Sequence, residues 1–212
     1  MGANWGVCFL GADVGQAADA AALVGLAPAG PRPAGVVPTW SAMVCETAPL
    51  GAPYAQLAAW LAHRARQLTT VGWSVMLAFD RTGVGRAVGE LLRDGLRDDA
   101  CEIVGVTAHA GKRMTGTWPD PNVPKTALAH ALITDLEQHA LAIPQALPAA
   151  HRLQDELTTY TAKTTEAGHV RYEHGAASAH DDVVAALQLA CWAGRHWYTV
   201  AHQIYRGGQV LA

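Results

Sequence analysis

Hydrophobic residues at the start of the chain group into three short runs separated by Gly and Pro. The runs are rich in small and β-favouring residues and lie at residues 4–12, 20–26 and 35–46. Short apolar runs bounded by Gly and Pro are typical of buried strands. The pattern therefore predicts three successive strands that pair as an antiparallel meander.

From residue 51 onward, helical and strand spacings alternate. Apolar side chains three and four positions apart predict an amphipathic helix over residues 54–68 and a second helix over 84–96. Between them, the continuous apolar run at 71–79 predicts a strand, and residues 101–106 predict one more short strand. The middle of the chain is thus expected to run helix, strand, helix, strand.

The second half of the chain is mainly helical in pattern. Residues 107–122 are polar and contain Gly, which predicts a long loop, and Pro124 suits the first turn of a helix that runs to about residue 139. Further helices are expected at about 149–160 and 180–198, with a polar hairpin or loop over 161–178 between them.

This order of elements predicts one mixed α/β sheet with helices on both faces. A five-stranded ribonuclease H-like sheet, with three antiparallel strands followed by two parallel ones, satisfies the order. The 212 residues are enough for one compact domain, and we find neither an internal repeat nor a linker that would divide the chain. We therefore expect a single domain over residues 1–212.

Composition limits the classes of function without choosing one. Half of the residues are hydrophobic and 16% are charged, which is typical of an ordinary folded protein. The net charge is -3 and the pI is near 6.3, so there is no overall positive field to attract nucleic acid. Any such binding must come from local basic patches or from bound cations.

The spacing of the cysteines and the absence of long apolar stretches argue against two further classes, namely zinc or disulfide-rich proteins and secreted or membrane proteins. Cys8, Cys45, Cys101 and Cys191 include no close pair and have no histidine at zinc-finger spacing, so a zinc site or a disulfide framework is not expected. No apolar run reaches about 18 residues and no signal-peptide pattern is present. We therefore expect a cytoplasmic protein without a membrane partner.

Acidic residues stand at the ends of three predicted elements: Asp13 after the first strand, Asp80 after the fourth, and Asp181 with Asp182 at the start of the last helix. If the first and fourth strands are neighbours, these carboxylates meet at one edge of the sheet. Carboxylates about 4 Å apart repel by roughly 4 kcal/mol per pair at an effective dielectric constant near 20, so a cation is expected between them. Oxygen ligands favour magnesium or manganese, and a pair of such ions suits hydrolysis of a phosphodiester.

Each acidic position also has a purely structural interpretation. Asp13 lies in the glycine-flanked segment 11–15 and suits a turn, Asp80 suits a turn or a helix cap, and the pair 181–182 suits the positive end of a helix dipole. Asp19 either leans back toward the same site or is a solvated turn residue. The coincidence of acidic residues at several element ends favours a shared site.

Basic residues of the late loops are candidate contacts for DNA phosphates. Such side chains would position a DNA backbone without reading its sequence, whereas many exposed basic groups only solvate a surface. The candidates are Lys112, Arg113, Lys125, Lys163 and Arg171.

Three motifs, taken in chain order, resemble the C-terminal nuclease domain of the large terminase subunit of tailed bacteriophages. The first is Gly-Ala-Asp-Val-Gly at 11–15, followed by Asp19, and the second is Phe-Asp-Arg-Thr-Gly-Val-Gly at 79–85. The last is the most specific and spans residues 180–192, His-Asp-Asp-Val-Val-Ala-Ala-Leu-Gln-Leu-Ala-Cys-Trp.

The resemblance implies a ribonuclease H-like fold and a two-metal endonuclease that cuts phage DNA when packaging starts and ends. By position, it makes Asp13, Asp80 and Asp181 the catalytic ligands of two Mg²⁺ or Mn²⁺ ions, with Asp182 and Asp19 as additional contributors. It also implies double-stranded DNA as substrate, partners that include a packaging ATPase, the small terminase and the portal, and the host cytoplasm as location. No ATPase domain is expected here, because the chain lacks a Gly-x-x-x-x-Gly-Lys-Ser/Thr loop.

Two other function classes stay open on sequence grounds. An actin-like or sugar-kinase-like nucleotide-binding domain shares this core and an Asp-x-Gly motif, although such proteins usually need two such domains. A noncatalytic docking module of a packaging complex would also keep acidic turns. Stabilisation by ATP and magnesium would favour the first class, and the absence of any metal-dependent cleavage would favour the second.

Overall fold

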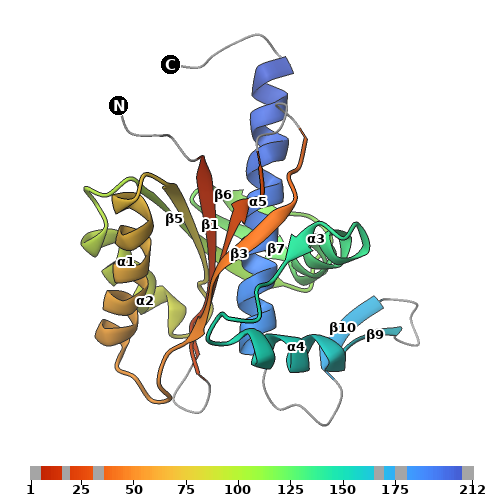
Figure 1. Cartoon of the computed structure of the whole chain (residues 1–212), viewed down its shortest axis with the longest axis horizontal. Coiled ribbons are helices and arrows are strands. Elements are labelled where there is room, and N and C mark those ends of the chain that lie inside the picture. Colours follow the sequence, from red (N-terminus) through yellow and green to blue (C-terminus); the bar gives the residue numbers. More distant parts are fainter. Residues whose placement is uncertain (1–5, 16–19, 31–35, 165–169, 175–180, 207–212) are drawn as a thin grey trace.

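The structure is a computed structural model that describes residues 6–15, 20–30, 36–164, 170–174 and 181–206 (Figure 1). Its helices are α1 (Tyr54–Thr70), α2 (Gly85–Gly95), α3 (Lys125–Glu137), α4 (Ala150–Thr159) and α5 (Asp182–Arg206). Its strands are β1 (Val7–Asp13), β2 (Ala22–Pro28), β3 (Trp40–Thr47), β4 (Ser74–Asp80), β5 (Cys101–His109), β6 (Thr115–Thr117), β7 (Asp120–Pro124), β8 (Leu141–Ala142), β9 (Tyr160–Thr164) and β10 (Val170–His174).

The main sheet contains eight strands in the order β6-β7-β5-β4-β1-β2-β3-β8. Its centre confirms the expected pattern, because β1, β2 and β3 form an antiparallel meander and β4 and β5 add in parallel beside β1. The prediction of only five strands is wrong, since β6, β7 and β8 extend the sheet at its two edges. These strands have five residues or fewer, so they carry too little alternation to be recognised in the sequence.

Helices cover both faces of the sheet, as predicted (Figure 1). Successive residues of a strand point to opposite faces, so Leu10 and Ala12 of β1 enter a core with α1 and α2. Phe9 enters a second core with α3, α4 and α5. The five helices therefore form two layers, with the sheet between them.

Helix α5 lies directly against β1 and runs in the opposite direction. A Cβ atom on Gly11 would overlap the backbone oxygen of Ala186 and the backbone nitrogen of Ala190, so only glycine permits this approach. Farther along α5, the ring of Trp197 lies 6.0 Å from that of Phe9. The first turn of α5 is therefore placed at the carboxyl end of β1.

The segment predicted as a loop over 107–122 is mostly strand. β5 continues to His109, β6 and β7 form an antiparallel hairpin, and β7 pairs in parallel with β5. Trp118, between the two hairpin strands, stacks on His196 of α5 at 5.5 Å, and His196 stacks on Trp192 at 5.3 Å. These long-range contacts hold the hairpin in place, whereas the exposed Thr-Gly-Thr of β6 has no apolar pattern of its own.

The ends of other elements differ from prediction by a few residues. The polar segment over 161–178 contains the hairpin of β9 and β10, one of its two predicted forms, and α5 extends beyond the expected end near residue 198. In the described part of the chain, we find no helix with both the length and the apolar character needed to cross a membrane.

Candidate active site

The chain places Asp13 and Asp80 at adjacent positions of neighbouring parallel strands. β1 and β4 are parallel and pair Ala12 with Phe79, so the following residues, Asp13 and Asp80, end the two strands side by side. Adjacent strands lie about 4.8 Å apart. The condition set for an acidic cluster, that the first and fourth strands are neighbours, is therefore met.

Both carboxylates lie on the α5 side of the sheet. Ala12 and Phe79 are buried in the core beneath α1 and α2, so the next residue of each strand belongs to the opposite face. Asp13 and Asp80 are half-buried there, and the exposed Asp181 directly precedes α5. The fold thus brings three acidic residues from distant parts of the sequence to the edge of the sheet at which the parallel strands β1 and β4 end.

The side chain of Asp80 is engaged by its own turn. Its Oδ1 accepts a hydrogen bond from the backbone N–H of Thr82 (2.8 Å), and its Oδ2 accepts one from the Thr82 hydroxyl (2.9 Å). Among the residues that the structure describes, no three His, Cys, Asp or Glu side chains form a group ready to hold a metal ion. The fit to magnesium or manganese therefore rests on oxygen ligand type and on placement, and the metal would compete with Thr82 for Asp80.

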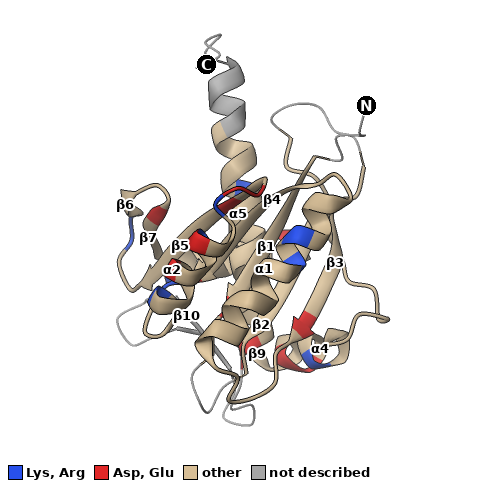
Figure 2. Cartoon of the chain, turned by 90° about the vertical axis from the view of Figure 1, so that its left-hand side faces the viewer, with Lys and Arg blue, Asp and Glu red and all other residues tan. Residues whose placement is uncertain are grey.

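Asp182, predicted as an additional ligand, is held by a basic residue of α4. It is 5% exposed, and its Oδ2 accepts a 2.5 Å hydrogen bond from Arg152. Arg152 also donates to Oε1 of Glu156 (2.8 Å), whose Oε2 accepts from the backbone N–H groups of Val183 and Val184 (3.0 Å each). Figure 2 shows acidic and basic residues gathered at α4.

Sequence reasoning assigned no role to this network around Arg152. A signal was present for Glu156, because it follows the buried Leu153 by three positions and so belongs to the apolar stripe of its helix. A carboxylate in such a stripe needs a buried partner. The sequence does not reveal that this partner is the first turn of α5.

Asp19, predicted as an additional contributor, lies outside the described residues, and so does His180, the first residue of the last motif. For the basic candidates Lys163 and Arg171 the backbone is described, and it places them directly opposite each other in the register of β9 and β10. Their hairpin begins at Tyr160, whose hydroxyl accepts a 2.6 Å hydrogen bond from Gln188 of α5. The hairpin therefore starts beside the N-terminal half of α5.

The other basic candidates lie at the same sheet edge as Asp80. Lys112 and Arg113 are exposed in the connection from β5 to β6, and the exposed Lys125 begins α3 directly after β7. Because β4, β5 and β7 are parallel, the residues that follow β5 and β7 emerge at the edge where β4 ends. Three of the five predicted phosphate contacts thus share an edge with the acidic residues.

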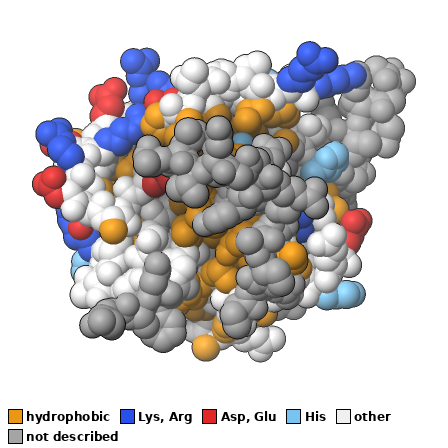
Figure 3. Space-filling view, turned by 90° about the horizontal axis from the view of Figure 1, so that it is seen from above, with side chains coloured by type: hydrophobic (Ala, Val, Ile, Leu, Met, Phe, Trp, Pro, Cys, Tyr) orange, Lys and Arg blue, Asp and Glu red, His pale blue; other side chains and the backbone are white. Residues whose placement is uncertain are grey.

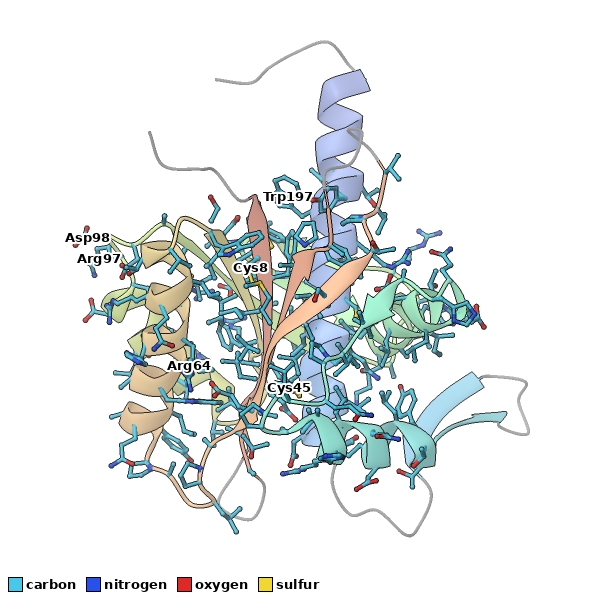
Figure 4. All side chains as sticks on the ribbon, viewed as in Figure 1. Cys8, Cys45, Arg64, Arg97, Asp98 and Trp197 are labelled. Atoms are coloured by element: carbon cyan, nitrogen blue, oxygen red, sulfur yellow. The ribbon has the colours of Figure 1, made fainter. Side chains whose placement is uncertain are left out.

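The cysteines take no part in this site. All four are free thiols, and burial raises the pKa of Cys8 and Cys101 to about 12 and that of Cys45 to about 11. These thiols stay protonated near neutral pH, whereas metal binding and nucleophilic attack need the thiolate. Figure 4 shows Cys8 and Cys45 well apart from each other, both among the side chains of the interior.

The opposite end of the molecule has a different surface. Seen from above, where β1 begins, hydrophobic side chains form a central band and charged side chains lie toward the rim (Figure 3). The acidic and basic candidates with described side chains belong instead to the edge where the parallel strands end.

Comparisons with known proteins identify similar folds rather than close relatives. No model of a protein family matches the sequence, and no curated protein matches it. The structure resembles the magnesium-bound large terminase nuclease of thermophilic phage G20c, with a TM-score of 0.58, 20% identity and coverage of 87% of this chain and 80% of that chain.

Two further structures extend the likeness. The manganese-containing nuclease domain of the large terminase subunit of bacterial virus Sf6 matches with a TM-score of 0.59 and 14% identity, over 87% of this chain and 86% of that one. The large terminase of bacteriophage HK97 matches with a TM-score of 0.53 and 14% identity, over 88% of this chain but 39% of that one. The chain thus has the ribonuclease H-like fold of terminase nuclease domains, which confirms the resemblance noted in the sequence at the level of fold.

Proposed function

We propose that this chain is a divalent-metal-dependent endonuclease that hydrolyses double-stranded phage DNA during genome packaging. The observation that carries the proposal is the register of β1 and β4, which ends both strands in adjacent aspartates beneath the first turn of α5. The same fold occurs in terminase nuclease structures with magnesium or manganese. The acidic edge and the fold point to the same chemistry.

The proposed ligands are Asp13, Asp80 and Asp181, whose carboxylate oxygens would hold two Mg²⁺ or Mn²⁺ ions. When bound, such ions ready a water molecule for attack and stabilise the oxygen that leaves the phosphorus. Metal binding by Asp80 would compete with its hydrogen bonds to Thr82, and Asp13 would offer its carboxylate from the neighbouring strand. Asp19 would be an additional contributor, whereas Asp182, which is held by Arg152, would support the site without being one of its three ligands.

The proposed DNA contacts flank the acidic edge. Lys112, Arg113 and Lys125 follow β5 and β7, and the hairpin that carries Lys163 and Arg171 starts beside α5. These residues would hold the phosphates of one duplex without reading its bases. Because the net charge is -3, binding by this chain alone is expected to be weak and strongly salt-dependent.

The proposed partners are those of a packaging machine. The chain covers 39% of the HK97 large terminase, so that protein is much longer than the shared nuclease fold. We propose that a packaging ATPase, as a further domain or a separate subunit, brings DNA to this nuclease together with a small terminase and a portal. The corresponding setting is the host cytoplasm.

Purified protein is expected to nick and linearise supercoiled plasmid in millimolar Mn²⁺ or Mg²⁺ and to lose this activity in EDTA. The physical reason is that the carboxylates alone cannot activate water for attack on a phosphodiester anion. Agarose gels of a metal titration measure the effect. Absence of cleavage with either metal, by protein whose folding is verified by circular dichroism, would contradict an autonomous nuclease and favour the docking-module alternative.

Removal of the two positive charges in the connection from β5 to β6, by Lys112→Gln with Arg113→Gln, is expected to weaken DNA binding about tenfold at low salt. The slope of log K against log salt should become shallower by about two, because each phosphate contact releases roughly one counterion. Fluorescence anisotropy with a labelled duplex measures both quantities. The matched control is Arg86→Gln with Arg97→Gln, two exposed arginines on or next to α2; an equal loss in this control would refute a local role for the connection.

A further inference from the structure

We propose that Arg152 and Glu156 of α4 are positioning residues of the nuclease site, which hold the first turn of α5 and so set the position of Asp181. This inference rests on the proposed function. It makes Asp182 part of the same hydrogen-bonded network, called the Arg152 network below, rather than a residue in direct contact with a metal.

The hydrogen bonds of Glu156 attach α4 to the start of α5. Its Oε2 accepts from the backbone N–H groups of Val183 and Val184, both at 3.0 Å. The first N–H groups of a helix have no partner within the helix. A carboxylate from outside the helix accepts hydrogen bonds from them, and its negative charge interacts favourably with the positive end of the helix dipole. Asp181 stands two residues before Val183, and its backbone oxygen accepts the helical hydrogen bond from the backbone N–H of Ala185 at 2.8 Å.

Arg152 completes the Arg152 network, because it donates hydrogen bonds to one carboxylate on α4 and one on α5. Its Nε donates to Oε1 of Glu156 at 2.8 Å, and its Nη2 donates to Oδ2 of Asp182 at 2.5 Å. The side chains of Glu156 and Asp182 are 5% and 6% exposed, whereas that of Arg152 is 34% exposed. One guanidinium thus compensates two buried negative charges and holds the first turn of α5 in one orientation relative to α4.

The other side of α5 leaves that turn little freedom. Gly11 of β1 is in contact with the backbone of Ala186, one helical turn beyond Asp182. The Arg152 network on the α4 side and the contact with Gly11 on the β1 side therefore hold α5 from two directions, close to where Asp13 ends β1. Loosening the α4 side, with the β1 contact still in place, would let Asp181 move relative to Asp13 and Asp80.

The test compares Mn²⁺ affinity across variants of the full chain, measured by isothermal titration calorimetry, with the unfolding temperature and plasmid cleavage alongside. Glu156→Gln keeps an oxygen that can accept from both N–H groups but removes the charge opposite Arg152. We expect Mn²⁺ affinity to fall about 10- to 100-fold, the range typical of residues that orient metal ligands. Cleavage should recover in part at saturating Mn²⁺, which a purely structural defect would not produce.

Conservative and control variants sharpen the comparison. Arg152→Lys retains a charge but cannot span both carboxylates as a planar guanidinium does, so it should lose less affinity than Arg152→Met. The control is Glu90→Gln, because Arg86 and Glu90 form an Arg–Glu pair with the same four-residue spacing on the exposed surface of α2. This control should bind Mn²⁺ as the wild type does.

The outcomes separate the inference from the function on which it rests. Wild-type protein that neither binds Mn²⁺ nor cuts DNA would overturn both. Wild-type protein that does both, with Glu156→Gln and Arg152→Met at wild-type affinity, would overturn the positioning role alone. A loss of affinity for Asp182→Asn as large as that for Asp181→Asn would likewise overturn it, because it would make Asp182 a ligand.

Discussion

Replacement of Asp13 by asparagine is expected to lower metal-dependent cleavage by at least about 10³-fold, equivalent to about 4 kcal/mol of transition-state stabilisation. Asparagine has the size of aspartate but lacks the negative charge with which the carboxylate would hold a divalent cation. Asp13 ends β1 beside Asp80, so it is the carboxylate best placed to face both proposed partners, Asp80 and Asp181. Initial rates of plasmid cleavage at several Mn²⁺ concentrations measure the effect.

Circular dichroism separates this loss from misfolding. In metal-free buffer, Asp13→Asn is expected to keep the wild-type circular dichroism spectrum, because asparagine has the size of aspartate and fits the same place at the end of β1. The control is Asp98→Asn at the exposed outer edge of the molecule (Figure 4), where cleavage should be unchanged. Wild-type rates in Asp13→Asn would remove Asp13 from the site and with it the assignment built on β1 and β4.

Replacement of Gly11 by alanine is expected to destabilise the fold by about 3 kcal/mol or more. The new methyl group would overlap backbone atoms of Ala186 and Ala190, which cannot rotate aside as a side chain can. The helix must shift as a whole, and with it the first turn that leads from Asp181. Urea unfolding followed by circular dichroism measures the change, which corresponds to a fall of roughly 6–12 °C in unfolding temperature for a chain of this size.

The matched control is Gly95→Ala at the end of α2, where an added Cβ meets no atom within 4 Å. This variant should be as stable as the wild type or slightly more so, because alanine favours helix. If Gly11→Ala were equally harmless, the close packing of α5 on β1 would be disproved.

The centre of the fold could be predicted from sequence because its strands carry strong local patterns. β1 and β4 are short apolar runs that each end in an aspartate, and their adjacency, the condition for an acidic cluster, is met in the structure. The edges could not be predicted in this way. β6 and β7 are held in place by the stacking of Trp118 on His196 of α5 and by the pairing of β7 with β5. Both contacts join residues far apart in the chain.

The site shows the same division. Asp13, Asp80 and Asp181 stand at the ends of predicted elements, so the sequence indicated them as candidates, but their meeting at one end of the sheet depended on the pairing of β1 with β4. The engagement of Asp182 by Arg152 did not follow, because an arginine four residues before a glutamate on a helix also describes the exposed pair on α2. Burial distinguishes the two pairs, and burial depends on how α4 packs against α5.

The order of elements along the chain has a consequence for biosynthesis. α5 supplies much of the core on its side of the sheet, yet a ribosome makes it after every strand of the main sheet. A growing polypeptide without α5 leaves that apolar face of the sheet bare and lacks Asp181. Under the proposed function, cutting ability arises only after α5 has been made, so nascent chains that have not reached α5 pose no hazard to the DNA around them.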